Sequence, residues 1–403
     1  MKITDVKVHL VHCPIPESER VTSAAGQKYA RQAAIVEIAT DAGISGIGPV
    51  SFGSASLDLL AVRVIVEQVF RPHLLGEDPL LTAYQWERMY RGAVVRAYGS
   101  RGLGVAVMSG IDIALWDVMG KAAGLPLYRL LGGYRQSIPA YASAVFWKRD
   151  PREAAAAAQH WVAKGFRAVK LKVGADLQSD VSAVRSVREA VGPDVLLMVD
   201  GNMVFTADAA IRFGREIEPY DIFFFEEPLF VEDLAGHARV AEALTIPVAT
   251  GENLTTRFAF RDLIERAGVD VVQADVSRAG GFTEGRRIVE LASAHGVGFA
   301  PHTFGDGLTF VANLHLLAAS PTGLIAEYDV TFNPLMTGLL QGMPHVADGV
   351  AQLTERPGLG VELDLDFVAR HPYAGEPGIG WGHAGPPVAV TGPAPSLEAG
   401  RGS

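Results

Sequence analysis

The most constraining feature of this chain is a strand–loop–helix unit that repeats between residues 138 and 330. Several of the strand candidates are short, nearly continuous apolar runs, which is typical of parallel strands buried on both faces. The helical stretch after the first run has Asp150 as its N-cap, Pro151 at its first position and Glu153 completing a capping box, and it ends at Gly165. Eight such units predict a (β/α)₈ barrel rather than an open sheet. The eight runs are SIPAYASAV, FRAVKLKVG, DVLLMVDGN, DIFFFEEPL, IPVATGEN, VDVVQADVS, GVGFAPHTF and LIAEYDV.

One polar, titratable residue stands at the C-terminal end of seven of these runs, at intervals of 23 to 28 residues. A barrel brings these strand ends to one mouth, where barrel enzymes place their active sites. Polar residues could simply mark where strands meet loops, but that explains one or two of them and not three acids at steps of 26 residues. We therefore predict one site at the mouth. Its seven residues are Lys172, Asp200, Glu226, Glu252, Asp275, His302 and Glu327.

Three of these residues, Asp200, Glu226 and Glu252, are carboxylates on consecutive strands. They would repel one another unless a hard cation neutralised them. The chain has a single cysteine, Cys13, so thiolate ligands are excluded. Oxygen ligands without clustered histidines suit Mg²⁺, and we predict one Mg²⁺ in the site.

The stretch FFFEEPLF, residues 223–230, places two adjacent carboxylates at the end of a very apolar strand. Neighbouring residues of a strand point to opposite sides, so only one of the two can face the barrel interior. We predict that Glu226 faces inward and binds the metal. Glu227 is then expected on the helix side or behind the ligands, as the partner of a nearby lysine or arginine.

Proton-transfer groups flank the three carboxylates. Lys170 and Lys172 are two residues apart and point the same way, so each disfavours the charge of the other, and burial should lower the pKa of Lys172 further. Lys172 then becomes a base near neutral pH, although a KxK pair can also be a solvated strand end. Asp275 and His302 lie on adjacent strands, and a carboxylate behind an imidazole fixes its tautomer and favours its protonated form.

Composition excludes several function classes. The net charge of −10 argues against nucleic acid or an anionic membrane as the main partner. Glycine, proline or charge interrupts every apolar run, so none is expected to span a membrane. The N-terminus MKITDVKVHLVH alternates like a strand and lacks the apolar region of a signal peptide. We expect a soluble, cytoplasmic protein.

The first 133 residues differ from the barrel units. Residues 1–50 contain three strand-like runs, and residues 56–133 are predicted to be helical. Within the segment SGIDIALWDVMGKAAG, apolar residues recur at helical spacing until Gly124 and Pro126 end the helix. The last residues, from about 381 to 403, are rich in proline, glycine and alanine, and we expect a flexible tail.

In combination, the motifs KLK, DGN, EEP, GEN and AEYD, with the Asp275–His302 pair, resemble the mandelate racemase subgroup of the enolase superfamily, which includes muconate lactonizing enzyme. The resemblance runs from residue 1 to about 370 and includes the segments GIDIALWD, LLGG and PGLGVELD. It implies an α+β cap over residues 1–133, a catalytic barrel over 134–330 and a C-terminal segment, 331–380, that completes the cap. It also implies a homo-oligomer, from dimer to octamer, that acts on a small carboxylate.

The resemblance assigns a role to each site residue. Lys172 is the base, and Lys170 modulates it and contacts the substrate carboxylate. Mg²⁺ is held by Asp200, Glu226 and Glu252, and His302 with Asp275 is the second acid/base. Glu327 hydrogen-bonds the substrate carboxylate, and Asn202 is a substrate contact. The shared chemistry is removal of a proton next to a carboxylate, with an enolate intermediate. If His302 protonates a β-hydroxyl, the enzyme is a dehydratase. If a proton returns to the same carbon, it is a racemase or epimerase, and if a lactone oxygen is the leaving group, it is a cycloisomerase.

Substrate specificity is expected from the loop TSAAGQKYARQA, residues 22–33, between the first two cap strands. Lys28, Tyr29 and Arg31 could contact a polar, anionic distal end of the substrate, although the segment could equally be an ordinary solvated hairpin. Arg96 and Tyr98 are weaker candidates of the same kind. The cationic loop favours dehydration of an acid sugar to a 2-keto-3-deoxy acid.

Two other classes compete with this interpretation. A non-catalytic barrel would be favoured by loss of Lys172 or His302, and both are present. A metal-dependent hydrolase usually needs clustered histidine ligands, whereas His302 is the one histidine at a strand end. Fold alone cannot decide between them, so the argument for proton abstraction rests on the site.

Overall fold

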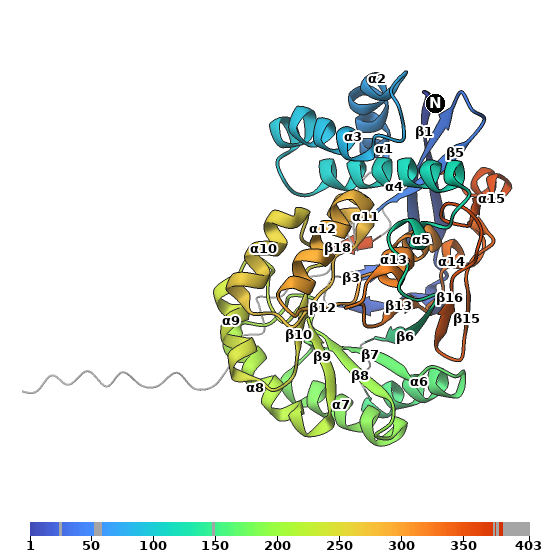
Figure 1. Ribbon diagram of the computed structural model, residues 1–403. Helices are drawn as coiled ribbons and strands as arrows, with labels where there is room; N and C mark the ends of the chain where they lie inside the picture. Colours follow the sequence, from blue (N-terminus) through green and yellow to red (C-terminus); the bar gives the residue numbers. More distant parts are fainter. Residues whose placement is uncertain (24–25, 52–58, 147–149, 374, 376–378, 382–403) are drawn as a thin grey trace, which may run out of the picture.

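The computed structural model describes residues 1–23, 26–51, 59–146, 150–373, 375 and 379–381. Its centre is a barrel of eight parallel strands below a smaller N-terminal sheet and its helices (Figure 1). The predicted fold, a (β/α)₈ barrel with an α+β cap, is confirmed. Residues 382–403, which make up almost all of the expected flexible tail, lie outside the described residues.

All eight predicted barrel strands form, and from β6 to β12 each strand pairs with its neighbour in the sequence. The barrel closes where β13 pairs with β6 and where Phe299 bridges Gly323 in parallel. The strands are β6 (Ser137–Val145), β7 (Ala168–Lys172), β8 (Leu196–Asp200), β9 (Ile222–Glu226), β10 (Val248–Thr250), β11 (Val271–Val272), β12 (Gly298–Phe299) and β13 (Ala326–Asp329).

Helices follow the strands and form the outer layer (Figure 1). The helix after β6 begins as predicted, because the Asp150 carboxylate accepts a hydrogen bond from Arg152 N at 2.9 Å. These helices are α6 (Pro151–Ala163), α7 (Leu177–Val191), α8 (Ala207–Ile217) with the 3₁₀ turn η4 (Glu218–Tyr220), α9 (Leu234–Ala243), α10 (Thr256–Ala267), α11 (Val276–Ala279), α12 (Gly281–Ala294) and α13 (Gly307–Ala319).

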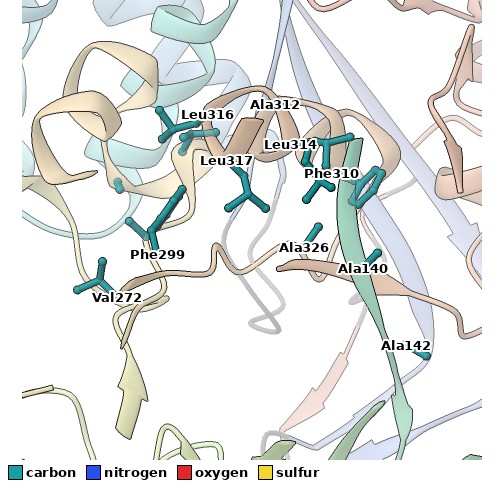
Figure 2. Close-up of a cluster of buried hydrophobic side chains, with 14 of the residues drawn as sticks. Ala140, Ala142, Val272, Phe299, Phe310, Ala312, Leu314, Leu316, Leu317 and Ala326 are labelled. Atoms are coloured by element: carbon teal, nitrogen blue, oxygen red, sulfur yellow. The ribbon is translucent and has the colours of Figure 1, made fainter. Parts of the chain in front are cut away.

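Helix α13 covers the seam where the barrel closes. Phe310, Leu314 and Leu317 point from it toward the strands, and Figure 2 shows them with Ala140, Ala326 and Phe299 in one buried cluster. Every residue of α13 except Ala319 is buried. A rigid α13 therefore lies directly behind the strand ends that carry Asp275 and His302.

The barrel interior below the mouth is filled by apolar side chains. Phe224 points inward and packs with Met198 and Tyr141, whereas Phe225 belongs to the core between strands and helices. The alternation expected for FFFEE is thus observed along β9 up to Glu226. The interior is a packed floor, and the mouth is where polar chemistry can take place.

The N-terminal cap is a three-stranded antiparallel sheet of β1 (Ile3–Pro14), β4 (Ala30–Thr40) and β5 (Ser45–Val50), covered by α4 (Leu103–Ala123). Gly46 and Gly48 let α4 approach β5, because a Cβ on either would lie 2.2 Å or less from a helix carbonyl oxygen. The other elements are η1 (Glu17–Glu19), β2 (Thr22–Ser23), β3 (Gly26–Lys28), α1 (Leu59–Val64), η2 (Ile65–Phe70), α2 (Arg71–Leu74), α3 (Thr82–Met89), η3 (Tyr90–Tyr98) and α5 (Leu127–Leu130).

Helix α4 is long and apolar, and it lies inside the protein. It has 21 residues, and an 18-residue window in it has a mean hydropathy of 1.5, so it is long and apolar enough to cross a membrane. However, 89% of that window is buried inside the protein. Its apolar composition reflects packing between the cap sheet and the barrel.

The C-terminal segment contacts both parts of the molecule. Pro372 bridges Val11 of β1, and β18 (Ile379–Trp381) pairs with β3 of the cap. The hairpin of β15 (His345–Ala347) and β16 (Val350–Gln352) instead extends the barrel sheet beside β6. The segment also contains α14 (Pro334–Thr337), β14 (Leu340–Gln341), β17 (Glu362–Leu363) and α15 (Leu365–Arg370).

Candidate active site

The strand register aligns the predicted site residues at the mouth. Lys172 of β7 pairs with Asp200 of β8, and Asp200 pairs with Glu226 of β9. The other predicted residues follow the ends of the shorter strands, except Glu327, which is within β13. One small cavity, of about 20 Å³, is lined by Lys28, Lys170, Lys172, Asn202, Glu252, His302 and Glu327 among others. The structure thus brings both lysines, the histidine and two of the acids to one space.

Lys170 is the centre of a buried ion-pair network. Its Nζ lies 2.7 Å from Glu226 Oε2, 2.9 Å from Glu327 Oε1 and 3.3 Å from Asp200 Oδ2. Burial disfavours the ammonium, but Glu226 and Glu327 outweigh burial and raise the pKa of Lys170 well above its ordinary value. Lys170 therefore acts as a fixed positive charge.

Lys172 forms a hydrogen-bonded ion pair with Asp200. Burial has the largest single effect and lowers the pKa of Lys172, as expected, and Lys170 adds to it. The carboxylates of Asp200, Glu226 and Glu252 together outweigh both, so the net direction is upward. The predicted low pKa is therefore wrong for the arrangement of protein groups alone. Burial and the neighbouring lysine could be inferred from the sequence, but the carboxylate of Asp200, which the strand register places against Lys172, could not.

Glu226 and Glu227 both lie in the site. Glu226 is fully buried, and burial and repulsion from Asp200 raise its pKa to about 8. Glu227 has φ +40°, so the chain leaves the strand conformation there, and the side chain accepts a hydrogen bond from Asn253 Nδ2 at 2.6 Å. Burial and the Glu252 and Asp200 carboxylates raise the pKa of Glu227 well above normal. The expected lysine or arginine partner of Glu227 is wrong, because its partner is an amide.

The Asp275–His302 pair forms as predicted. His302 Nδ1 lies 3.0 Å from Asp275 Oδ2, and both side chains are buried. Asp275 Oδ1 accepts hydrogen bonds from Ser277 Oγ at 2.6 Å and Asn313 Nδ2 at 2.8 Å. Burial opposes the imidazolium, but Glu252 and Asp275 raise the pKa of His302. The proton on Nδ1 is thereby fixed, and Nε2 faces the cavity side.

Glu252 stands between the two sides of the mouth. Its Oε2 is 3.7 Å from His302 Nε2, and its Oε1 is 3.8 Å from Arg278 Nη1. Arg278 also donates to the Glu252 backbone oxygen at 2.7 Å. Arg278 was not predicted, because it follows Asp275 inside a short helix rather than ending a strand.

Glu327 is held more tightly than expected. Oε1 accepts from Ser143 Oγ at 2.7 Å, and Oε2 accepts from Thr303 N at 2.9 Å. Burial would raise the pKa of Glu327, but Lys170 and His302 lower it strongly. Glu327 is therefore an anion here and orients Lys170, so donating a hydrogen bond to a substrate carboxylate would first require its protonation.

The site fits a divalent cation by its donor set. Among the described residues, no three acidic or imidazole groups already form a metal cluster, because the lysines draw Asp200 and Glu226 toward themselves. Even so, the site contains more buried carboxyl groups than the two lysine ammonium groups can neutralise. The raised pKa of Glu226 is consistent with this excess of negative charge. The carboxylates that could share a hard cation are Asp200, Glu226, Glu252 and, by its proximity, Glu227.

The substrate-contact candidates separate into two groups. Lys28 and Asn202 line the cavity. Arg31 does not, because its guanidinium forms a buried ion pair with Asp329 at 3.0 Å. Tyr29 is 38% exposed and stacks with Arg20 outside the cavity. The weaker candidates Arg96 and Tyr98 are exposed on η3, also outside the cavity lining.

Several supporting residues were missed from the sequence. They are Ser143, Asn253, Ser277, Arg278, Thr303 and Asn313. Most are neutral and act through hydrogen bonds, so charge at a strand end could not reveal them. Ser143 and Asn253 carried a usable signal, since both are polar residues at or just beyond barrel strands.

Comparison with known proteins places the chain in a family. Residues 5–132 match the mandelate racemase / muconate lactonizing enzyme N-terminal domain, and residues 153–367 match the enolase C-terminal domain-like family. The chain is 36% identical to D-galactarolactone cycloisomerase of Agrobacterium fabrum, covering 91% of this chain and 97% of the relative. It is 35% identical to arabinonate dehydratase of Saccharolobus solfataricus, covering 81% and 87%.

The solved structures agree with these matches. A racemase from Streptomyces coelicolor A3(2) with bound magnesium superposes with a TM-score of 0.83 at 32% identity, covering 92% of this chain and 99% of that one. Both halves of the chain and the site between them therefore lead to one conclusion. The chain belongs to the enolase superfamily, in the group of mandelate racemase and muconate lactonizing enzyme.

Proposed function

We propose that this protein removes the proton next to the carboxylate of an acid sugar, in a Mg²⁺-dependent reaction, and then eliminates water to give a 2-keto-3-deoxy acid. The observation that carries the proposal is the pairing of two proton-transfer groups, Lys172 and the His302–Asp275 pair, around one carboxylate-rich cavity. The dehydratase and cycloisomerase relatives support acid-sugar chemistry of this kind.

We propose Asp200, Glu226 and Glu252 as the residues that hold Mg²⁺. When bound, the cation would stabilise negative charge that develops on the substrate carboxylate. Lys170 adds a fixed positive charge to the same end of the cavity, held in place by Glu327. A magnesium-containing relative of the same fold supports the choice of metal.

The chain's own groups account for the proton movements. Lys172 Nζ, once neutral, accepts the α-proton, and the electron pair of the broken C–H bond forms the enolate. His302 Nε2 then gives its proton to the β-hydroxyl as the C–O bond breaks, so that water leaves rather than hydroxide. The resulting enol tautomerises to the 2-keto-3-deoxy acid. Asp275 keeps His302 oriented throughout and touches no reacting atom.

A cycloisomerase is the second candidate. In that reaction His302 would protonate a departing lactone oxygen instead of a hydroxyl. The similarity to the galactarolactone cycloisomerase favours this alternative over racemisation or epimerisation, which would use the same two groups on one carbon. We also propose that the chain works as a cytoplasmic homo-oligomer without nucleic-acid or membrane partners, in keeping with its net charge of −10.

A library of acid sugars and their lactones, followed by ¹H NMR in D₂O, tests the function directly. A dehydratase yields a keto acid that reacts with semicarbazide, and EDTA stops the reaction until Mg²⁺ is returned. A cycloisomerase acts on the lactone and forms no keto acid from the open-chain hydroxy acid. Exchange of the α-proton with inversion and no keto product would contradict dehydration, and full activity after exhaustive chelation would contradict the metal.

A further inference from the structure

Lys28 occupies a fixed position at the cap side of the cavity. It lies on β3, which is paired on one side with β2 and on the other with β18, where Lys28 is in register with Ile379. Three other residues near it, Val21, Ser23 and Gly26, line the same cavity. The backbone below Lys28 is therefore part of a three-stranded sheet, and its side chain projects toward the mouth from a defined point.

The ammonium of Lys28 lacks an anionic partner within the described part of the chain, where no carboxylate lies within ion-pair distance of it. Its Nζ instead lies 4.2 Å from the centre of the Phe304 ring. Asp329, the acid with most influence on Lys28, already accepts hydrogen bonds or ion pairs from Arg31, Thr331 and Asn333. Burial, Arg31 and Lys172 lower the pKa of Lys28 well below its ordinary value, so an anion placed beside Nζ would stabilise the charged form of this side chain.

We propose that Lys28 binds a second carboxylate at the distal end of the substrate, so that the site takes a dicarboxylic acid sugar, or its lactone, in preference to a monocarboxylic one. This inference rests on the proposed function, because it assumes that the first carboxylate lies at the Lys170 end of the cavity. The two lysine ends of one cavity then match the two charged ends of one substrate.

The surroundings of Lys28 favour a carboxylate over a phosphate. Arg31 lies 4.9 Å from the centre of the same Phe304 ring, but it is paired with Asp329 and donates to the Phe332 backbone oxygen. One ammonium beside an aromatic ring can satisfy a carboxylate, whereas a phosphate dianion usually recruits several donors.

Matched pairs of six-carbon acid sugars test the inference. Each pair has the same configuration at carbons 2 to 5 and carries either a carboxylate or a hydroxymethyl group at carbon 6; a third compound carries a phosphate there. Turnover and calorimetric binding are measured with Mg²⁺ for the wild type, Lys28→Met, and Arg20→Met. The Arg20→Met control removes a cap charge of the same sign that stacks on Tyr29 outside the cavity.

We expect the wild type to prefer the dicarboxylate by about 10- to 100-fold in kcat/KM, the range for a charged hydrogen bond. Lys28→Met should lose that preference by weakening the dicarboxylate alone, while Arg20→Met should keep it. Preference for the hydroxymethyl or phosphate compound, or an equal loss for all compounds in Lys28→Met, would overturn the assignment. Absence of α-deuterium exchange with every compound would overturn the proposed function instead, and the binding preference would still decide the role of Lys28.

Discussion

The two sides of the barrel mouth are built in different ways. On the lysine side, β7, β8 and β9 carry Lys170, Lys172, Asp200 and Glu226, whose charges compensate one another. On the histidine side, after β11 and β12, Asp275 is held by neutral donors from Ser277 and Asn313 and presents one free oxygen to His302. The lysine side is held by buried ion pairs between oppositely charged groups, whereas the histidine side is held by hydrogen bonds from neutral donors.

This difference has a physical origin. Lysine–carboxylate pairs can exchange partners at little geometric cost, so a cation that binds the acids can rearrange them. The histidine side is fixed by backbone and helix α13, and each oxygen of Asp275 already has its donor. We therefore expect substitutions on the lysine side to act through metal binding and substitutions on the histidine side to act on one proton transfer.

The largest effect is expected from Glu226→Gln. It removes a charged ligand and one of the three carboxylates that pair with Lys170, so Mg²⁺ binding by calorimetry should be lost and activity should fall at least about a thousandfold. Glu227→Gln is the matched control, with the same change one residue later and an amide already beside it. We expect Glu227→Gln to keep the metal with a smaller kinetic loss. The reverse order of losses would show that Glu227 is the ligand and that the inward-facing assignment is wrong.

A smaller but more selective effect is expected from His302→Asn. Removing the general acid should slow water loss by about 10²- to 10⁴-fold. Exchange of the α-proton in D₂O should continue, because Lys172 on the other side of the mouth is intact. Parallel measurement of exchange and keto-acid formation separates the two steps. Equal loss of both would mean that the two sides do not act independently.

The charged part of this site was predictable, and its supporting part was not. Lys172, Asp200 and Glu226 lie in one row because parallel strands repeat at regular intervals, and the sequence records that interval directly. Ser277 bonds locally to Asp275, the N-cap of α11, whereas Asn313 reaches Asp275 from another helix, so its hydrogen bond depends on how α13 packs. No spacing rule carries that information.

The wrong expectations share one cause, which is competition between neighbours that only the packed structure reveals. Lys172 was expected to have a low pKa, but its register partner Asp200, together with Glu226 and Glu252, outweighs burial and reverses the direction. Arg31 was expected at the substrate, but Asp329 two residues after Glu327 binds it first. In both cases the chemistry of the residue was interpreted correctly, but the partner that it contacts in the folded chain was not predicted.

Asn313→Ala tests whether the histidine side is held by neutral donors. The substitution removes the donor to Asp275 and the acceptor of Val276 N, so the imidazole loses orientation. We expect elimination to slow about ten- to a hundredfold while α-proton exchange changes little. Thr309→Val, one turn earlier on α13 and bonded to Asp306 instead, is the control and should leave both rates unchanged. A matching fall in both rates for Asn313→Ala would indicate loss of folding rather than loss of orientation.

The last expected effect concerns pH, and it distinguishes the two adjacent glutamates on the lysine side. Burial and Asp200 raise the pKa of Glu226 to about 8, so below that pH a proton competes with Mg²⁺ for this carboxylate. Lys170 stays cationic across the same range, since its own pKa is raised, and it releases no proton there. Mg²⁺ affinity should therefore rise with pH by up to about tenfold per unit between pH 6 and 8 and level off above.

Calorimetry in buffers of different ionisation enthalpy measures this release, and we expect close to one proton per Mg²⁺ at pH 7 and far less at pH 9. Glu227→Gln should keep the proton release, because the titrating ligand Glu226 is still present. The histidine-side variant His302→Asn should keep it as well. An affinity that is flat with pH, or a release that disappears in Glu227→Gln, would move the ligand role to Glu227. The contrast between a rearranging lysine side and a preformed histidine side would then rest on a different carboxylate.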